Sequence, residues 1–270
     1  MEILPPTVPD KWDAEVYTEN SSAQFTWANE LIEKLHLKGD ESLLDIGCGN
    51  GKVSSVLADK LKQGRVVGID TSHNMFAMAI AAIEHSGHEN LCFHVMDARH
   101  IILRGKFDVA FSNAVLHRVD DHQAVLAGTR KHLNDNGRIL FQMGGKGSAA
   151  ELYSVINHVI WSSYWCGYFE GFSFPYHFYD VDDYNQWLPQ NGFRAERIEL
   201  IPKDMVHENI EALKGWLRAT KSDYTHRLPE ELRESFLDEI VTEYTAIYPL
   251  DAKGQTHVNM IRLEVEAFAD

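Results

Sequence analysis

Short apolar runs alternate with amphipathic segments over the first half of the chain, and this alternation predicts its architecture. The apolar runs are predicted β-strands at 42–46, 65–69, 91–96, 107–111 and 137–143. The amphipathic segments are predicted helices within 11–38 and at 51–62, 73–85 and 120–134. Repeated strand and helix units favour an α/β fold with a parallel sheet.

Aromatic side chains concentrate in the second half of the chain, chiefly within 148–178. We interpret this segment as an insertion over a pocket, although aromatic residues at helical spacing, such as Trp161 and Trp165, are more often plain core. The remaining pattern predicts strands at 193–201 and 256–268 and helices at 207–221 and 229–247. We therefore expect a single domain over 1–270, divided into a ligand-binding core (about 38–145), a lid (about 146–190) and a part that completes the sheet and a cap (191–270).

A glycine-rich turn follows the first predicted strand, with glycine at 47, 49 and 51. Glycine tolerates positive φ and lets a ligand approach the backbone, while the next helix offers unpaired N–H groups at its N-terminus. A dinucleotide fingerprint would need its third glycine at position 52, which is Lys52. The spacing therefore argues against a nicotinamide cofactor, and an NAD-dependent oxidoreductase is kept as an alternative.

Aspartates end the next two predicted strands. Asp70 lies 23 positions after Gly47, close to the roughly 20-residue offset at which a carboxylate receives ribose hydroxyls, and Asp97 ends the following strand. A single aspartate at a strand end is often only a turn residue or a helix cap. Both acids, however, lie at the carboxyl ends of predicted parallel strands, where open α/β sheets bind ligands. Together they predict a cofactor site.

The order of these segments resembles the cofactor motifs of the class I S-adenosylmethionine-dependent methyltransferases. The resemblance implies a Rossmann-like, mostly parallel seven-stranded sheet with an antiparallel C-terminal edge strand, preceded by an N-terminal helix. It also implies S-adenosylmethionine as cofactor, with the acid at 70 on the ribose and the acid at 97 on the adenine amine. The residues that it assigns to the cofactor are Asp45, Gly47, Cys48, Gly49, Gly51, Asp70, Thr71, Met75, Asp97, Ala98, Asn113, Tyr17 and Gln24.

The segment Trp12–Tyr17 and the tail from Gly215 are similar to small-molecule carboxylate methyltransferases, the trans-aconitate and juvenile hormone acid enzymes. This resemblance implies a carboxylate oxygen as the methyl acceptor. In the juvenile hormone acid enzymes an aromatic residue tends to follow the closing-loop histidine, whereas Arg118 follows His117 here, which favours a polar or anionic acceptor. The residues expected at the acceptor are Gln24, His117, Arg118, Trp161, Trp165 and Tyr168.

The acceptor decides whether His117 acts chemically. A carboxylate is already ionised at neutral pH, so its methylation requires positioning and no base. An amine or hydroxyl acceptor would need proton removal, for which His117 is the nearest candidate. N- or C-methylation of another small molecule is therefore an alternative, and so is a cofactor-binding regulator without turnover.

The composition limits the kinds of molecule that this protein is expected to bind. Forty acidic and 25 basic residues give a net charge of −15, which disfavours a nucleic acid substrate and favours a small molecule. The three cysteines lack metal-ligand spacing, so no metal is expected. Neither a secretory signal nor an apolar run of roughly 18 residues is visible, so we expect a cytoplasmic protein that does not enter a membrane. The pattern indicates no oligomeric state.

Overall fold

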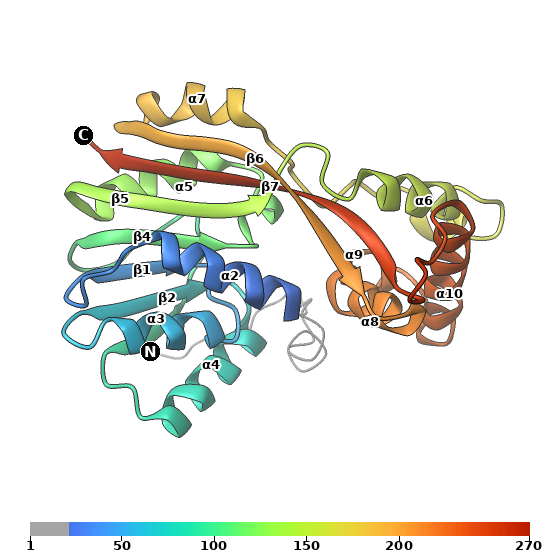
Figure 1. Ribbon diagram of the computed structural model, residues 1–270, viewed down its shortest axis with the longest axis horizontal. Helices are drawn as coiled ribbons and strands as arrows, with labels where there is room; N and C mark the ends of the chain where they lie inside the picture. Colours follow the sequence, from blue (N-terminus) through green and yellow to red (C-terminus); the bar gives the residue numbers. More distant parts are fainter. Residues whose placement is uncertain (1–21) are drawn as a thin grey trace.

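The computed structural model describes residues 22–270, with side chains from residue 25 onward (Figure 1). Seven strands form one sheet in the order β3-β2-β1-β4-β5-β7-β6. Their bounds are β1 Ser42–Ile46, β2 Arg65–Asp70, β3 Leu91–Val95, β4 Phe107–Asn113, β5 Leu133–Gly144, β6 Phe193–His207 and β7 Thr256–Ala269. Strands β1 to β5 pair in parallel, and β7 is antiparallel to both β5 and β6. The expected α/β class is confirmed; the antiparallel strand β7 lies inside the sheet, and β6 holds the edge.

Helices cover both faces of the sheet because its central strands are apolar on both sides. Leu43 packs with α2, α3 and α4 on one face, whereas its neighbour Leu44 packs with α5 and α7 on the other. Consecutive apolar residues are what a parallel strand buried on both faces requires. These helices are α2 Ser22–Lys34, α3 Lys52–Lys60, α4 His73–Ser86, α5 His122–His132 and α7 Val181–Gln190.

A second group of helices forms a helical subdomain beyond one end of the sheet (Figure 1). It contains α6 Ala150–Ile160, α8 Ile210–Thr220, α9 Ser222–Thr225 and α10 Glu230–Ile247, and the long strands β6 and β7 run into it. Helices α6, α8 and α10 share one apolar core. The expected lid at 146–190 therefore supplies only part of this subdomain, and α7, which belongs to the same segment, packs on the sheet instead.

Residues 134–137, with the turn-forming sequence Asn-Asp-Asn-Gly, lie within β5. Asn136 adopts a left-handed φ of +59°, and the pairing register with β4 shifts between Phe107 and Val109. These turn-forming residues are thus accommodated as an irregularity within the strand, because Asn tolerates the left-handed region. Strand β6 likewise extends past 201 to His207, since β7 pairs with it along its whole length.

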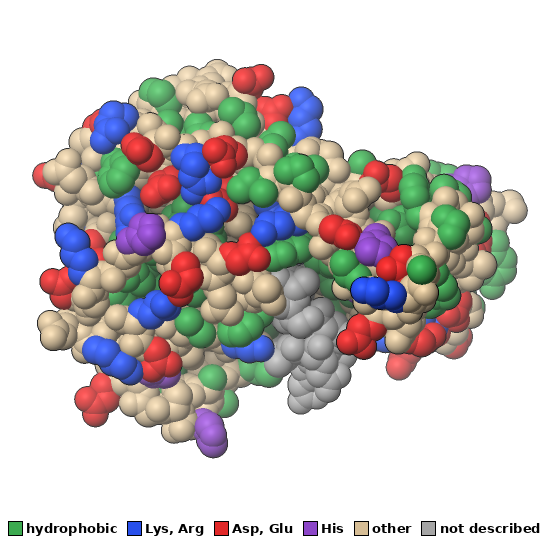
Figure 2. Space-filling model, viewed as in Figure 1, with side chains coloured by type: hydrophobic (Ala, Val, Ile, Leu, Met, Phe, Trp, Pro, Cys, Tyr) green, Lys and Arg blue, Asp and Glu red, His purple; other side chains and the backbone are tan. Residues whose placement is uncertain are grey.

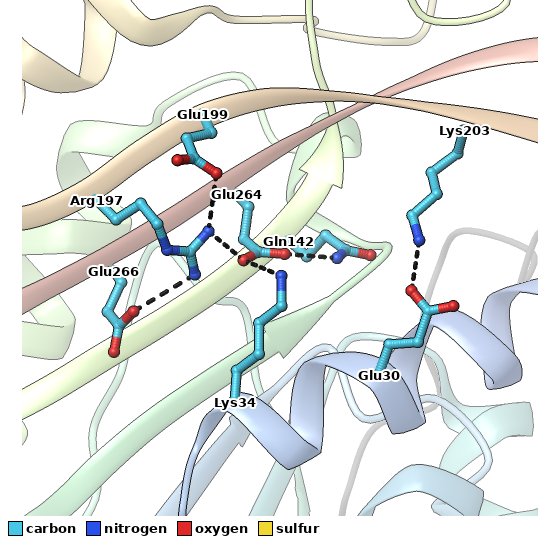
Figure 3. A network of polar contacts seen from close by, with 8 residues as sticks. All are labelled: Glu30, Lys34, Gln142, Arg197, Glu199, Lys203, Glu264 and Glu266. Carbon is cyan, nitrogen blue, oxygen red and sulfur yellow. Dashed lines mark hydrogen bonds and ion pairs between the residues drawn. The ribbon is translucent and has the colours of Figure 1, made fainter.

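A buried acid attaches α2 to the sheet (Figure 3). Glu264 on β7 is fully buried and accepts hydrogen bonds from Lys34 of α2 at 2.6 Å and from Gln142 of β5 at 3.0 Å. Arg197 of β6 forms an ion pair with the same carboxylate. The Lys34 and Arg197 partners hold the pKa of Glu264 below its usual value, although burial alone would raise it. Because a buried charge is tolerated only when it is paired, this network determines where α2 lies.

On the face shown in Figure 2, basic side chains are interspersed with acidic ones over the sheet-bearing part of the molecule. Among the described residues, no helix combines the length and apolar character needed to cross a bilayer.

Candidate active site

A cavity of about 770 Å³ lies at the carboxyl ends of β1, β2, β3 and β4. Its volume is within the range usual for cofactor and ligand pockets. The sheet side of its wall includes the predicted residues Gly47, Gly49, Asp70, Thr71, Met75, Asp97, Ala98, Asn113 and Arg118. The opposite wall comes from the helical subdomain and its loops: Gly171, Phe172, Ser173, Phe174, Pro175, His177, Asp223 and Arg227.

The glycine loop borders this cavity through its backbone. Gly47 has φ +76°, and a Cβ built on it would lie 2.2 Å from Cγ1 of Val115, which also lines the cavity. Gly49 has φ +53° and would meet nothing within 4 Å. Cys48 and Gly51 were expected to contact the ligand, but neither lines the cavity: the first is buried against β2, and the second caps α3 in front of Phe93. Both residues therefore shape the glycine loop from outside the cavity wall.

The two acids near the loop have different environments. Asp45 is buried outside the cavity, where it accepts a hydrogen bond of 2.6 Å from Ser54 of α3. Burial, aided by the negative charge of Asp70, raises the pKa of Asp45 to about 7. The expectation that Asp45 contacts the cofactor is therefore corrected: it ties the end of β1 to α3.

Asp70 lies at the end of β2 and lines the cavity. Its Oδ2 accepts from the backbone N–H of Gly49, and its Oδ1 from that of Ser72, each at 2.9 Å. These bonds fix the carboxylate beside the glycine loop, and each oxygen has lone-pair capacity for a further donor. The geometry is therefore compatible with the predicted ribose contact.

Asp97 shares the rim of the cavity with Arg99. The guanidinium donates to both carboxylate oxygens, at distances of 2.7 to 3.1 Å, and also to Asp120 at 2.8 Å. The hydrogen bonds from Arg99 hold the pKa of Asp97 below its usual value. Asp97 therefore stays ionised, with both oxygens as acceptors, and Arg99 joins the loops that follow β3 and β4.

A second, smaller cavity of about 60 Å³ lies next to the first, and Ala114 and Arg118 line both. Its wall also contains His117, Gly144, Ser148, Ala149, Tyr153, Tyr176, Phe178, Trp216, Thr220, Lys221, Met260 and Arg262. The lysine and arginine side chains of this wall are Arg118 from the loop after β4, Lys221 between α8 and α9, and Arg262 from β7. We call this space the inner pocket and these three residues its basic cluster.

Arg118 is fixed at the junction of the two cavities. It forms an ion pair of 2.7 Å with Asp223, donates to the carbonyl of Thr220 at 2.8 Å and to the Tyr176 hydroxyl at 3.2 Å. Its guanidinium also lies 4.9 Å from the centre of the Tyr176 ring. The structure thus places Arg118, which was predicted to contact the acceptor, at the junction of the two cavities.

Lys221 is buried, and its amine faces aromatic side chains. The Nζ atom lies 2.8 Å from the Tyr153 hydroxyl and 3.5 Å from that of Tyr176, and between 4.7 and 4.9 Å from the ring centres of Tyr153, Tyr176 and Trp216. Burial, with the positive charge of Arg118, lowers the pKa of Lys221 well below its ordinary value. Arg262 is buried too, 4.3 Å from the ring centre of Trp27 on α2.

His117 lines the inner pocket and not the larger cavity. Its Nδ1 accepts from the backbone N–H of Gly144 at 3.2 Å, and its ring stacks 5.8 Å from that of Tyr176. Burial, and then the charge of Arg118, lowers its pKa well below the usual value. A neutral ring that accepts at Nδ1 carries its proton on Nε2. His117 therefore presents a donor to the pocket, which is unfavourable for a general base.

Three predicted acceptor residues lie elsewhere. Trp165 is 1% exposed in the core of the helical subdomain, where its Nε1 donates to Glu239 at 2.7 Å. Trp161 is 60% exposed, and Tyr168 is also on the surface. None of the three lines either cavity, so this expectation is corrected. Tyr17 lies outside the described residues, and the side chain of Gln24 is likewise not described.

Other aromatic residues of the same segment take their place. Phe172 and Phe174 line the larger cavity, and Tyr153, Tyr176 and Phe178 the inner pocket. The sequence showed that the segment is aromatic but not which side chains turn inward. Lys221 and Arg262, which sequence reasoning missed, carry no motif at all. Among residues 25–270, no group of His, Cys, Asp and Glu is arranged to hold a metal ion.

Comparisons of the sequence and the fold with known proteins identify the family. Residues 37–191 match the family model described as "Methyltransferase domain". An uncharacterised methyltransferase of Schizosaccharomyces pombe is 27% identical over 230 residues, which cover 82% of this chain and 84% of that protein. A trans-aconitate 2-methyltransferase of Deinococcus radiodurans is 31% identical over 132 residues, about half of each chain at 49%.

Among solved structures, a phosphoethanolamine N-methyltransferase 2 of Haemonchus contortus, in complex with S-adenosylhomocysteine, superposes with a TM-score of 0.62. The superposition covers 97% of this chain and 58% of the Haemonchus chain, at 17% sequence identity. At that identity the likeness is one of fold.

Proposed function

The chain belongs to the methyltransferase domain family, and we propose that it transfers a methyl group from S-adenosylmethionine to a carboxylate oxygen of a small acid. Family membership and fold make it an S-adenosylmethionine-dependent methyltransferase, which sets aside the NAD-dependent and non-catalytic alternatives. The choice of acceptor is our proposal, and the basic cluster of the inner pocket supports it.

The residues of the larger cavity fit this cofactor. The backbone at Gly49 faces open space, Gly47 packs closely against Val115, and Asp70 has acceptor capacity for ribose hydroxyls. Asp97 and Met75 line the same cavity, and we assign them to the adenine, as a hydrogen-bond acceptor and an apolar contact respectively. When bound, the cofactor supplies a methyl group activated by its positively charged sulfur.

The observation that carries the carboxylate proposal is the charge of the inner pocket. Arg118, Lys221 and Arg262 surround a space that is large enough for a small polar group such as a carboxylate. An ionised carboxylate would be attracted by this cluster, whereas a protonated amine would be repelled. The anion is already a nucleophile, so the protein needs only to hold it against the cofactor cavity and exclude water. That His117 is unsuited to act as a base fits this mechanism.

N-methylation of an amine that also carries an anionic group is the second candidate. The inner pocket would then hold the anion, and the amine would extend into the larger cavity. The same basic cluster supports this arrangement, and the Haemonchus protein with a similar fold is an N-methyltransferase. C-methylation finds no specific support in the geometry.

Methyl transfer from labelled S-adenosylmethionine to matched acceptors tests the proposal. We expect transfer to small carboxylic acids, with an alkali-labile ester product, and none to the corresponding amides. Arg118→Met should raise the KM for the acid at least tenfold, while Arg194→Met, at an exposed site, should not. Base-stable methylation of amino acids or phosphoamines, with no ester formed, would favour the second candidate and refute the first.

A further inference from the structure

Helix α2 contacts the wall of the inner pocket through Trp27. The guanidinium of Arg262, which lines that pocket, lies over the Trp27 ring, with its Cζ atom 4.3 Å from the ring centre. Trp27 is buried and belongs to the apolar core that α6, α8 and α10 share. Arg262 is buried as well, and a cation over an aromatic face is attracted most strongly where water is excluded. A helix that precedes the sheet in the chain therefore reaches the space that we assign to the acceptor.

The backbone of Arg262 is fixed by the sheet, whereas its side chain is long and has several rotatable bonds. Residue 262 lies in β7, where it is opposite Gly144 of β5 on one side and Ile201 of β6 on the other. Contact with the face of a ring holds a guanidinium without using its N–H donors, which lie in the plane of the group. The Trp27 ring is therefore suited to orient Arg262 without competing for the hydrogen bonds that an acceptor would need.

The position of Trp27 is itself set by a second contact between α2 and β7 (Figure 3). Arg262 and Glu264 are two positions apart on β7 and therefore share one face of the strand. Trp27 and Lys34 are seven positions apart on α2, about two turns, and share one face of the helix. Lys34 donates to Glu264 at 2.6 Å, while Trp27 contacts Arg262. The ion pair thus anchors the helix whose tryptophan lies against the arginine.

We propose that Trp27 is a positioning residue for the acceptor, because its ring holds the Arg262 guanidinium in the orientation that binds the acceptor's carboxylate. This role rests on the proposed function, since it requires a carboxylate to bind in the inner pocket. Trp27 lines neither cavity, so it acts through Arg262 and not by contact. Burial and the charges of Arg118 and Arg262 lower the pKa of His117 in the same wall, so the charge of Arg262 does act on the pocket.

Loss of the ring should weaken acceptor binding selectively. Without it the guanidinium keeps its charge but samples more orientations, so a carboxylate must order the side chain when it binds. Ordering one long side chain lowers an affinity by roughly three- to tenfold. Arg262 does not line the larger cavity, so we expect the affinity for S-adenosylhomocysteine to remain unchanged.

A double-mutant cycle tests the proposal, with propionate titrated calorimetrically into enzyme saturated with S-adenosylhomocysteine. Trp27→Leu should raise the Kd for propionate by roughly three- to tenfold, and Trp27→Phe, which retains a ring face, should recover most of the affinity. Arg262→Met should weaken binding further, and adding Trp27→Leu to it should have no additional effect. Glu30→Gln, which breaks the ion pair of α2 with Lys203, is the control and should bind propionate as wild type does.

Fluorinated tryptophan placed at position 27 alone tests the same contact with little change of shape, and so applies even if Trp27→Leu fails to fold. Each fluorine withdraws electrons from the ring and weakens the attraction of its face for a cation. We expect the propionate affinity to fall with each added fluorine. The same substitution at Trp161, which is 60% exposed and lines neither cavity, should have no effect.

The outcomes separate the two proposals. Wild-type affinity for propionate in Trp27→Leu or in the fluorinated protein would overturn the inference and leave the carboxylate acceptor intact. Additive effects of Trp27→Leu and Arg262→Met, or a parallel loss of S-adenosylhomocysteine binding in Trp27→Leu, would do the same, since Trp27 would then act by a route other than Arg262. Failure of wild type to bind propionate, although it binds S-adenosylhomocysteine, would refute both.

Discussion

Arg118 and Asp223 join the two parts of the molecule through an ion pair in which Nη1 lies 2.7 Å from Oδ2. Arg118 belongs to the turn Leu116–Arg118 that follows β4, and Asp223 lies on α9 of the helical subdomain. Both side chains line the larger cavity and both are largely buried. The pair therefore joins the helical subdomain to the sheet beside the junction of the two cavities.

Replacing Asp223 with Asn should destabilise the protein, because it leaves a buried guanidinium without its counter-charge. Loss of one partner of a buried pair typically costs about 3 kcal/mol or more. Denaturant unfolding would measure the change, with Asp59→Asn at an exposed pair as the control. Equal unfolding free energies for the two variants would mean that the pair contributes no more than a surface contact.

Replacing Asp70 with Asn should weaken S-adenosylhomocysteine binding by at least tenfold. The amide keeps one acceptor oxygen but loses the charge that strengthens hydrogen bonds to ribose, and such bonds contribute about 1.5–3 kcal/mol each. Calorimetry on wild type and variant gives the ratio of the dissociation constants. Unchanged affinity would refute the assignment of this carboxylate to the cofactor.

Two glycine variants separate the effect of a steric clash with Val115 from the effect of backbone strain at a positive φ. Gly47→Ala places a Cβ against Val115 in addition to the strain of a positive φ, whereas Gly49→Ala has the strain alone, about 1–2 kcal/mol. We expect the first to lose cofactor binding and the second to retain most of it. The double variant Gly47→Ala with Val115→Ala should recover part of the loss. Equal effects of the two single variants would show that strain alone matters.

The stability of the protein should fall as the pH decreases from about 6.5 to about 4. His122 is buried between the Tyr184 hydroxyl at 2.8 Å and the Leu116 carbonyl at 2.7 Å, and burial lowers its pKa to about 4. The unfolded chain binds the proton first, at its ordinary pKa near 6.5, so the contribution is complete above that value and lost through this interval. His207, whose pKa burial also lowers to about 4, acts in the same direction.

Unfolding free energies at pH 7, 5.5 and 4 would measure this loss, about 3 kcal/mol for His122 alone. His122→Gln, which cannot titrate, should be less stable at pH 7 but show a correspondingly shallower decline. A variant with the same pH profile as wild type would show that His122 is not the group responsible.

Replacing Trp165 with Ala should lower stability by about 3–5 kcal/mol, because it empties a site in the core of the helical subdomain. Trp165 packs against Phe236 with 5.1 Å between the ring centres, and it lines neither cavity. Acceptor KM and cofactor affinity of the folded fraction should therefore change little. Trp161→Ala, at an exposed site, is the control, and a selective rise in acceptor KM for Trp165→Ala would restore the predicted role in binding.

The order and type of most elements could be read from the sequence. Strands buried on both faces, such as Ser42–Ile46, produce continuous apolar runs, and helices that cover a sheet produce a helical period. The residues that line the larger cavity could be located in the sequence for a related reason. They lie within short segments at the ends of consecutive parallel strands, so their separation along the chain reflects their separation in space.

The inner pocket depends on tertiary structure alone. Arg118 lies 103 positions before Lys221, and Arg262 lies 41 positions after it. The three residues meet only because β7 enters the sheet beside β5 while α8 and α9 fold back over its end. Which aromatic residues of 148–178 turn inward was decided in the same way, by packing against α8 and α10. Local propensity carries no information about such contacts. The sequence by itself therefore determined the sheet and the glycine loop, whereas tertiary packing decided the charge and shape of the inner pocket.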